Sequence, residues 1–292
     1  MRILILLLLA FTSLHISAQI IWGVKSFHIT SAHTSFPDTA RAKGHIYRNT
    51  LYEAATHYSD SSVLIIVPEN LDSKKKTDLI FWFHGWGNNI DSAAIRYALT
   101  RQFASSHVNA VLVLAETAKD APDSYGGKLE TNLVFKELVN DVMNKLKVEK
   151  AIGKKCRPGN IMLAGHSGAY RVMAYILQNG GLEIKEIILF DALYADTGKY
   201  IDWIKKNPRH RFINMFTDHG GTDGETREMI KLLQKEGISY DTTTEEGMHD
   251  QELIRHSILI IHSLRMHNDI INDPDNFEFF MKTSPFLKKI KR

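Results

Sequence analysis

The stretch Asn160-Ile161-Met162-Leu163-Ala164-Gly165-His166-Ser167-Gly168-Ala169 decides the fold. Its first half is a short apolar run that is typical of a buried strand, and its second half places a serine among small residues where a helix begins. A strand, a sharp turn and a helix in this order are the context of the G-x-S-x-G turn, in which crowding leaves room only for small side chains beside the serine. Ala169 replaces the last glycine of that pattern and is still small. We therefore predict that Ser167 is a nucleophile, held in a strained backbone conformation at the end of a strand.

Apolar runs and helical patterns alternate along the rest of the chain. The predicted strands are Val63–Val67, Leu79–Phe83, Ala110–Ala115, Asn160–Ala164, Ile187–Phe190, Phe212–Phe216 and Ile238–Thr243. The predicted helices are Asp91–Ala104, Leu133–Leu146, Val172–Leu177, Tyr200–Lys206, Thr222–Gln234 (with Thr222 and Glu225 as a capping box) and Gln251–Leu264. Strands that are apolar at nearly every position are typical of a parallel sheet covered on both faces. The pattern predicts an α/β protein with a mostly parallel central sheet, helices on both faces and a single domain.

The composition excludes several classes of protein. The chain has 292 residues, with 36 Lys+Arg against 33 Asp+Glu, a net charge of +3, 44% hydrophobic residues and one cysteine. These values are ordinary for a folded globular protein and exclude a disordered chain, a collagen-like repeat and a disulfide-stapled miniprotein. The net charge is too small to favour nucleic acid as a partner. Cys156 has no second cysteine to pair with, and we expect it to be an unreactive loop residue.

The N-terminus has the pattern of a secretory signal peptide. Arg2 precedes an apolar run from Ile3 to Phe11, and Ser17-Ala18-Gln19 offers a small residue before a cleavage point. The run is too short to span a bilayer, and no later segment is apolar enough to do so. We expect cleavage after Ala18 and export to the periplasm or the medium. The predicted organisation is a signal peptide over 1–18, a folded domain over 19–268 and a tail over 269–292 whose basic end is solvated.

Ligands of an open parallel sheet bind beyond the carboxyl ends of its strands, so the residues that follow each strand are the candidates for chemistry. The strand Leu79–Phe83 is followed by His84-Gly85-Trp86-Gly87. Acyl transfer needs two backbone N–H groups for the charge that develops on the carbonyl oxygen. We predict that the N–H groups of Trp86 and Gly168 supply them.

A serine nucleophile also needs a base and an acid that orients the base. His249 follows the predicted last strand and is the predicted base. Asp218 follows Phe212–Phe216 and Asp191 follows Ile187–Phe190, so either carboxylate can reach the same edge of the sheet. Asp218 is slightly preferred, and both stay open.

The residues from about 63 to 264 resemble the α/β-hydrolase fold. The turn at Ser167, the His-Gly-x turn at His84 and the order Ser…Asp…His carry the resemblance. It implies a serine hydrolase, most simply a carboxylic-ester hydrolase, that works through a Ser-His-Asp triad and an acyl-enzyme without a cofactor or a metal. In that family the acid usually follows the strand that corresponds to Phe212–Phe216, but some lipases take it from the preceding strand.

Two alternatives compete with this interpretation. The fold could serve binding without catalysis, although both the nucleophile and the base positions are filled. A metal-dependent hydrolase could use the pairs Asp218-His219 and His249-Asp250, but adjacent residues rarely point at one ion.

The chain between Tyr194 and Trp203 is too short for an inserted lid. The loop Thr117–Leu129 is long enough to form a pocket rim. An enzyme without a lid favours an accessible small-molecule or glycan-linked ester as the substrate, and the sequence gives no oligomeric state.

Overall fold

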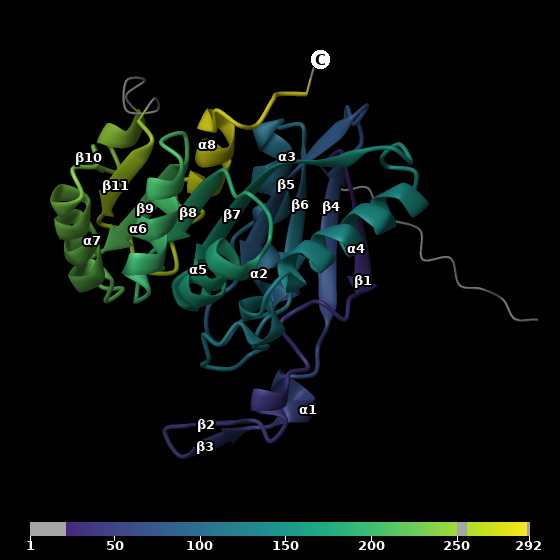
Figure 1. Ribbon diagram of the computed structural model, residues 1–292, viewed down its shortest axis with the longest axis horizontal. Coiled ribbons are helices and arrows are strands. Elements are labelled where there is room, and N and C mark those ends of the chain that lie inside the picture. Colours follow the sequence, from purple (N-terminus) through teal and green to yellow (C-terminus); the bar gives the residue numbers. More distant parts are fainter. Residues whose placement is uncertain (1–21, 250–255, 291–292) are drawn as a thin grey trace, which may run out of the picture.

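A 9-stranded sheet forms the centre of the molecule (Figure 1). The computed structural model describes residues 22–249 and 256–290, without the side chain of His249. In spatial order the strands are β1 (Val24–Thr30), β4 (Ser62–Pro68), β6 (Ala110–Ala115), β5 (Lys76–Phe83), β7 (Arg157–His166), β8 (Glu186–Phe190), β9 (Arg211–Thr217), β11 (Ile258–Ser263) and β10 (Asp241–Thr244). β4 runs antiparallel to both of its neighbours, and every other pair is parallel. The predicted mostly parallel sheet is confirmed.

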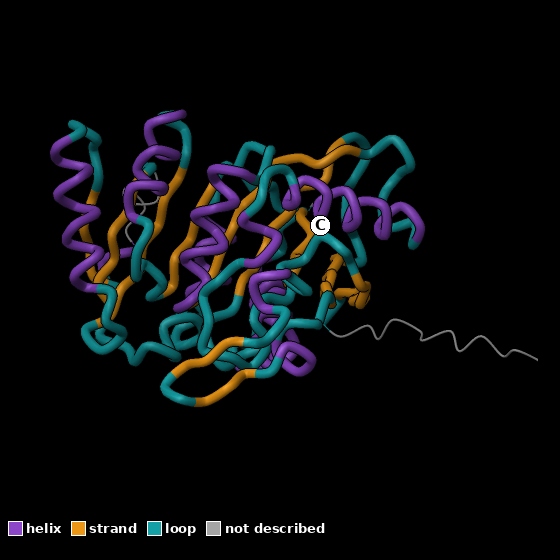
Figure 2. Tube along the Cα trace, turned by 60° about the horizontal axis from the view of Figure 1, so that its bottom comes forward, coloured by secondary structure: helices purple, strands orange, loops and turns teal. Residues whose placement is uncertain are grey.

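Helices cover both faces of the sheet, as predicted. α4 (Val134–Val148), α5 (Tyr170–Asn179), α6 (Thr197–Lys206) and α7 (Asp223–Lys235) bury their apolar sides in one cluster. α2 (Ile90–Arg96), α3 (Leu99–Ser106) and α8 (Asn276–Thr283) do so in a second cluster on the opposite face. Successive strand residues alternate between the two clusters, so that Phe81 faces the first cluster while Ile80 and Trp82 face the second. Figure 2 shows the helices packed along the strands of the sheet.

The prediction of a helix over Gln251–Leu264 is wrong for the described part of that segment. Residues 256–264 contain β11, which lies between β9 and β10 and is parallel to both. Ile258 and Ile260 enter one core cluster, whereas Leu259 and Ile261 enter the other. An unbroken apolar run suits a strand buried on both faces as well as a buried helix, so its periodicity cannot separate the two. The last strand of the sheet therefore ends at Ser263.

The segment predicted as a tail, 269–292, contributes to the core. Phe277, Phe280 and Met281 on α8 are fully buried in the second cluster. Arg101 on α3 donates two hydrogen bonds, of 2.8 and 2.6 Å, to the carboxylate of Asp275 just before α8. Lys288 and Lys289 near the basic end are exposed. The helix closes one face of the sheet and is part of the same folded unit.

A small excursion leaves the body of the protein after β1. It consists of the hairpin β2 (His45–Tyr47) and β3 (Thr50–Tyr52), followed by α1 (Ala54–His57). Figure 1 shows it below the sheet. The predicted signal peptide lies outside the described residues. No helix in the described ranges combines the length and apolarity that crossing a membrane requires.

Replacing Phe277 with alanine tests whether 269–292 belongs to the fold. The ring is fully buried between α8 and the sheet, so the cavity left behind should lower the free energy of unfolding by about 3–5 kcal/mol. Urea titration followed by circular dichroism measures this change. Leu264→Ala is the matched control, because Leu264 is 73% exposed and its loss should cost no more than about 0.5 kcal/mol. Equal stabilities of the two variants would contradict the assignment of α8 to the core.

Candidate active site

Ser167 lies on a sharp turn between β7 and α5. β7 ends at His166, a 3-10 helix spans Ser167–Ala169, and α5 follows at Tyr170. The φ angle of Ser167 is 53°, in the left-handed region that non-glycine residues seldom adopt. A Cβ atom at Gly165 would lie 2.6 Å from the Met173 sulfur and 2.7 Å from the Ala169 Cβ, so only glycine fits there. This is the strained, crowded turn that the sequence pattern predicts, with its serine only partly buried.

Asp191 follows β8 directly and holds a histidine. Its side chain is fully buried, and Oδ2 accepts a hydrogen bond of 2.7 Å from Nδ1 of His267. The same oxygen accepts a hydrogen bond of 2.6 Å from the Thr217 hydroxyl, and Oδ1 accepts one from Thr222. Burial alone would raise the pKa of Asp191, but the hydrogen bonds from His267, Thr217 and Thr222 outweigh it and place the pKa below its ordinary value. A charged Asp191 fixes the tautomer of His267, with Nδ1 protonated and Nε2 free to accept a proton.

The loop after β9 is shaped around Asp191. Thr222 precedes α7 as its N-cap but makes no capping hydrogen bond with its side chain. The expected capping box with Glu225 therefore does not form, because the Thr222 hydroxyl donates to Asp191 instead. A Cβ atom at Gly220 would lie 1.7 Å from Oδ2 of Asp191, so no side chain fits at that position. The loop encloses the carboxylate and keeps water away from it.

His166 connects the end of β7 to the backbone of His267. Its Nε2 donates a hydrogen bond of 2.9 Å to the His267 carbonyl oxygen, and the two rings lie 4.4 Å apart. Burial, with a smaller contribution from His267, lowers the pKa of His166 to about 3. His166 is therefore neutral and acts as a fixed donor. This hydrogen bond holds the loop that carries His267 against the end of β7, directly before Ser167.

Tyr194 contacts Ser167, Gly220 and His267. Its hydroxyl interacts with Ser167 and donates a hydrogen bond to the carbonyl oxygen of Gly220. Its ring lies edge-on to His267, with 6.4 Å between ring centroids. Burial and the charge of Asp191 raise the pKa of Tyr194 to about 12, with the hydrogen bond to Ser167 acting in the opposite direction. Tyr194 stays protonated and lies between the serine and the enclosed carboxylate.

The structure brings His267 to Asp191, whereas sequence reasoning named His249 as the base. His249 ends a 3-10 helix over Gly247–His249, and its side chain lies outside the described residues, so that prediction stays untested. His267 was missed because β11 was interpreted as a helix, which left His249 as the histidine after the last strand. Interpreting the run Ile258–Ile261 as a strand would have pointed to the loop that contains His267.

The two candidate acids occupy different environments. Asp218 is 55% exposed, and its Oδ1 lies 2.8 Å from Nε2 of His262, a residue of β11. Asp191 is fully buried and bonded to His267. Since a triad acid is shielded from solvent, the geometry favours Asp191 over Asp218.

The turn after β5 lies against Ser167. A Cβ atom at Gly85 would lie 2.6 Å from the Ser167 Cβ and 3.2 Å from its Oγ. No described residue accepts a hydrogen bond from the Trp86 backbone N–H. Gly168 lies in the first turn of its short helix, where backbone N–H groups lack intrahelical acceptors. Two unused donors therefore flank the serine, in the places predicted for an oxyanion site.

Aromatic side chains surround the serine. The Trp86 indole lies over Gly168, where a Cβ atom would approach it to 2.5 Å, and its Nε1 donates a hydrogen bond of 2.7 Å to the Ser124 hydroxyl. Ser124 belongs to the loop predicted as a pocket rim. The Trp86 ring is 46% exposed and meets Tyr47 of the hairpin β2–β3 edge-on, at 5.3 Å. Tyr170 also interacts with Ser124, and its ring lies 6.0 Å from that of Tyr194.

Cys156 lies outside this site. It comes directly before β7, is buried, and has its sulfur 3.2 Å from the hydroxyl of Thr77.

Solved structures with a similar fold include serine hydrolases and esterases. A ferulic acid esterase matches with a TM-score of 0.53 and 9% identity, over 89% of this chain and 98% of its own. The feruloyl esterase module of Clostridium thermocellum matches with a TM-score of 0.53 and 9% identity, over 93% and 90%. The fluorophosphonate-binding serine hydrolase F of Staphylococcus aureus matches with a TM-score of 0.50 and 11% identity, over 89% and 98%.

This chain has the α/β-hydrolase fold. The resemblance inferred from the residues around Ser167 is thus confirmed at the level of architecture. No family model and no curated protein sequence matches the chain. At such low identities the likeness concerns the fold, and the fold alone does not determine the chemistry.

Replacing each candidate acid with its amide shows which of Asp191 and Asp218 orients the catalytic histidine. Asp191→Asn should lower the rate at which a fluorophosphonate modifies Ser167 by ~10⁴-fold, because the amide no longer holds His267 in the productive tautomer. Asp218→Asn should leave that rate within a factor of about two, because its carboxylate is exposed and bonded to His262. Stopped-flow or gel-based labelling measures both rates. A larger loss in Asp218→Asn would reverse the assignment.

Proposed function

We propose that the protein is a serine esterase that hydrolyses carboxylic esters through an acyl-enzyme. The observation that carries the proposal is the hydrogen bond between the buried Asp191 and His267. The backbone of His267 is bonded to His166, the residue before a serine whose φ angle is 53°. A strained serine, an oriented imidazole and two unused backbone donors are the groups that acyl transfer requires. The fold and the serine hydrolases that share it support the same chemistry.

Each residue has a definite role in the reaction. Nε2 of His267 takes the proton of the Ser167 hydroxyl while Oγ attacks the ester carbonyl carbon. The N–H groups of Trp86 and Gly168 bind the oxygen that becomes negative. His267, stabilised as an imidazolium by Asp191, then gives the proton to the leaving alcohol, and the acyl group stays on Ser167. A water molecule deprotonated by His267 attacks the acyl-enzyme, which releases the acid and restores the serine.

The surroundings of the serine favour an accessible ester. Trp86 is 46% exposed, and α6 begins at Thr197, so the chain after Tyr194 has no room for an inserted lid. The proposed substrates are small-molecule or glycan-linked esters, and two of the similar structures are named for ferulic acid and feruloyl esters. The signal-peptide pattern at the N-terminus supports export, which would place the enzyme where glycan-linked esters are found. Tyr47, Trp86 and Tyr170 offer flat surfaces for an aromatic acyl or alcohol group.

Ser167→Ala tests the nucleophile. The wild type should be modified by a fluorophosphonate and hydrolyse p-nitrophenyl acetate, and the variant should do neither above the rate in buffer, because no other group can form the acyl-enzyme. Intact-protein mass spectrometry shows whether one adduct forms, and peptide mapping shows where. A wild type that resists the probe and hydrolyses no aryl ester would support a binding role for this fold instead.

His267→Ala and His249→Ala test the base. Loss of His267 should lower kcat for p-nitrophenyl acetate by about 10⁴-fold or more, and adding Ser167→Ala should lower it little further, because the two residues act as a unit. Loss of His249 should leave kcat within about threefold of the wild type, in keeping with a residue outside the reacting groups. Initial-rate kinetics at pH 8 measure both effects. The opposite ranking would return the role of base to His249.

A further inference from the structure

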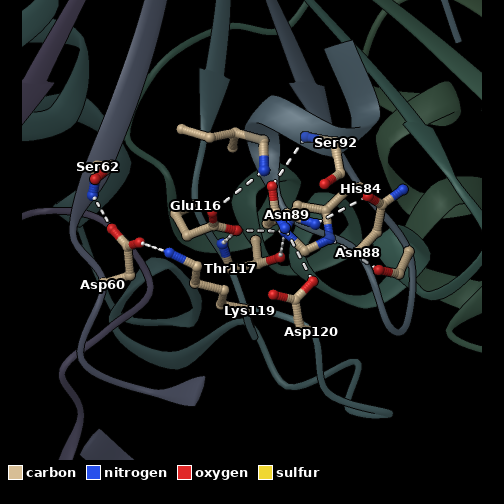
Figure 3. A network of polar contacts seen from close by, with 12 residues as sticks. Asp60, Ser62, His84, Asn88, Asn89, Ser92, Glu116, Thr117, Lys119 and Asp120 are labelled. Atoms are coloured by element: carbon tan, nitrogen blue, oxygen red, sulfur yellow. Dashed lines mark hydrogen bonds and ion pairs between the residues drawn. The ribbon is translucent and has the colours of Figure 1, made fainter. Parts of the chain in front are cut away.

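A buried histidine–carboxylate pair, His84 and Glu116, adjoins the turn that carries the Trp86 N–H. Figure 3 shows the polar contacts of the pair. His84 follows β5 and Glu116 follows the neighbouring strand β6, and both side chains are 1% exposed. Nε2 of His84 lies 2.5 Å from Oε1 of Glu116 and 2.9 Å from the hydroxyl oxygen of Thr117. Nδ1 of His84 lies 2.8 Å from the carbonyl oxygen of Gly85. The reaction described above uses neither His84 nor Glu116.

The partners of the His84 ring determine its protonation. A carbonyl oxygen can only accept, so Nδ1 carries a proton and donates it to Gly85. Nε2 faces a carboxylate at a distance typical of a charged hydrogen bond. Burial, the largest single effect, acts to lower the pKa of His84, but the charge and hydrogen bond of Glu116, together with Gly85 and Asp120, outweigh it, so the pKa lies above its ordinary value. Nδ1 therefore donates to Gly85, and Nε2 shares a proton with Glu116.

The hydrogen bond to Gly85 orients the peptide between Gly85 and Trp86. A peptide unit is planar, and in the trans form its C=O and N–H point in opposite directions. His84 holds the carbonyl oxygen on its own side, so the Trp86 N–H must face away from His84. The turn lies against Ser167, as the 2.6 Å approach of a Cβ atom at Gly85 to the Ser167 Cβ demonstrates. Among the described residues nothing accepts a hydrogen bond from this N–H, which leaves it for a ligand.

Glu116 secures the other end of the same turn. Its Oε2 accepts a hydrogen bond of 3.2 Å from the N–H of Ile90, the first residue of α2, and its Oε1 accepts one of 3.2 Å from the N–H of Thr117. Asn89 caps α2 through its side chain and also donates a hydrogen bond of 2.9 Å to Asp120 (Figure 3). One carboxylate thus connects the end of β6, the start of α2 and the His84 ring. The turn is fixed at both ends before any substrate arrives.

We propose that His84 and Glu116 are positioning residues, which hold the Gly85–Trp86 peptide so that its N–H points at the oxygen that becomes negative in the transition state. The inference rests on the proposed esterase function and adds to it two residues that orient an oxyanion donor. His84 acts through the peptide and does not touch the substrate. Preorganised donors stabilise developing charge because no reorganisation is needed when the reaction occurs.

Two isosteric replacements of His84 provide a matched test. The amide nitrogen of asparagine can occupy the place of Nδ1 and donate to Gly85, whereas that of glutamine can occupy the place of Nε2 and donate only to Glu116. His84→Gln should lower kcat for p-nitrophenyl acetate by ~10²–10³-fold with little change in KM, which is the effect of losing one oxyanion donor. His84→Asn should lose about tenfold or less. Both remove the same imidazole from the same buried site, so a purely structural role would not rank them in this order.

Variants at Glu116 and Glu186 separate positioning from stability. In Glu116→Gln the amide can donate to Nε2 of His84 and leave the proton on Nδ1, so its kcat should fall less than that of His84→Gln. Glu186 forms a comparable buried pair with Arg211 at 2.5 Å, at the starts of β8 and β9 and away from the carboxyl ends. Glu186→Gln should lower the melting temperature but leave kcat and KM at wild-type values.

The outcomes distinguish the inference from the function on which it rests. A wild type that is neither modified by a fluorophosphonate nor active overturns the esterase function, and the inference falls with it. An active wild type with equal kcat losses in His84→Asn and His84→Gln, or with losses confined to KM, overturns the inference alone. An activity loss in Glu186→Gln as large as that in His84→Gln would also overturn the inference alone, because lost stability would then account for both losses.

Discussion

The buried carboxylate of Asp191 is the constraint on which the site depends. A charge that is removed from water must be compensated by hydrogen bonds, and Asp191 receives them from His267, Thr217 and Thr222. These donors come from two separate segments, the end of β9 with the loop that follows it, and the loop after β11. Neither loop has regular structure to hold its shape. Hydrogen bonds to the carboxylate hold both loops against the end of β8. The bond from His267 also fixes the position and the tautomer of its imidazole.

The sheet supplies a second pair of the same kind. His84 and Glu116 follow the adjacent strands β5 and β6, are fully buried and satisfy each other's hydrogen bonds. In both pairs a carboxylate is bonded to a histidine, and each histidine has a proposed role beside Ser167. The pair Arg211–Glu186 at the opposite end of the strands joins only structural elements. This edge of the sheet therefore combines one fully buried and one partly exposed histidine–carboxylate pair with a strained serine.

The strain at Ser167 is supported by close packing around it. Gly165, Gly85 and Gly168 each lie where a Cβ atom would approach a neighbour to 2.6 Å or less. Backbone conformations of this kind persist only when the surroundings determine them fully. The same crowding presses the turn of the Trp86 N–H against the serine, so the strain and the proposed oxyanion site share one cause.

Much of this protein could be derived from the sequence alone. The apolar runs determined the parallel sheet and its two helical layers, because a strand that is apolar at each position must be buried on both faces. The spacing of small residues around Ser167 determined the turn, because only small side chains fit beside it. The prediction failed where a local pattern supports two structures, as in the run Ile258–Ile261, which suits a helix or a strand equally well.

Only the tertiary structure decided which histidine and which aspartate meet. Asp191 and Asp218 both follow strands that end at the same edge, and their difference lies in burial: one is enclosed by the turn at Gly220, while the other is open to solvent. His267 is separated from Asp191 by 76 positions, and no spacing rule connects them. Local sequence determines secondary structure and turns through nearby sterics, whereas a catalytic set depends on which loops the packed sheet brings together.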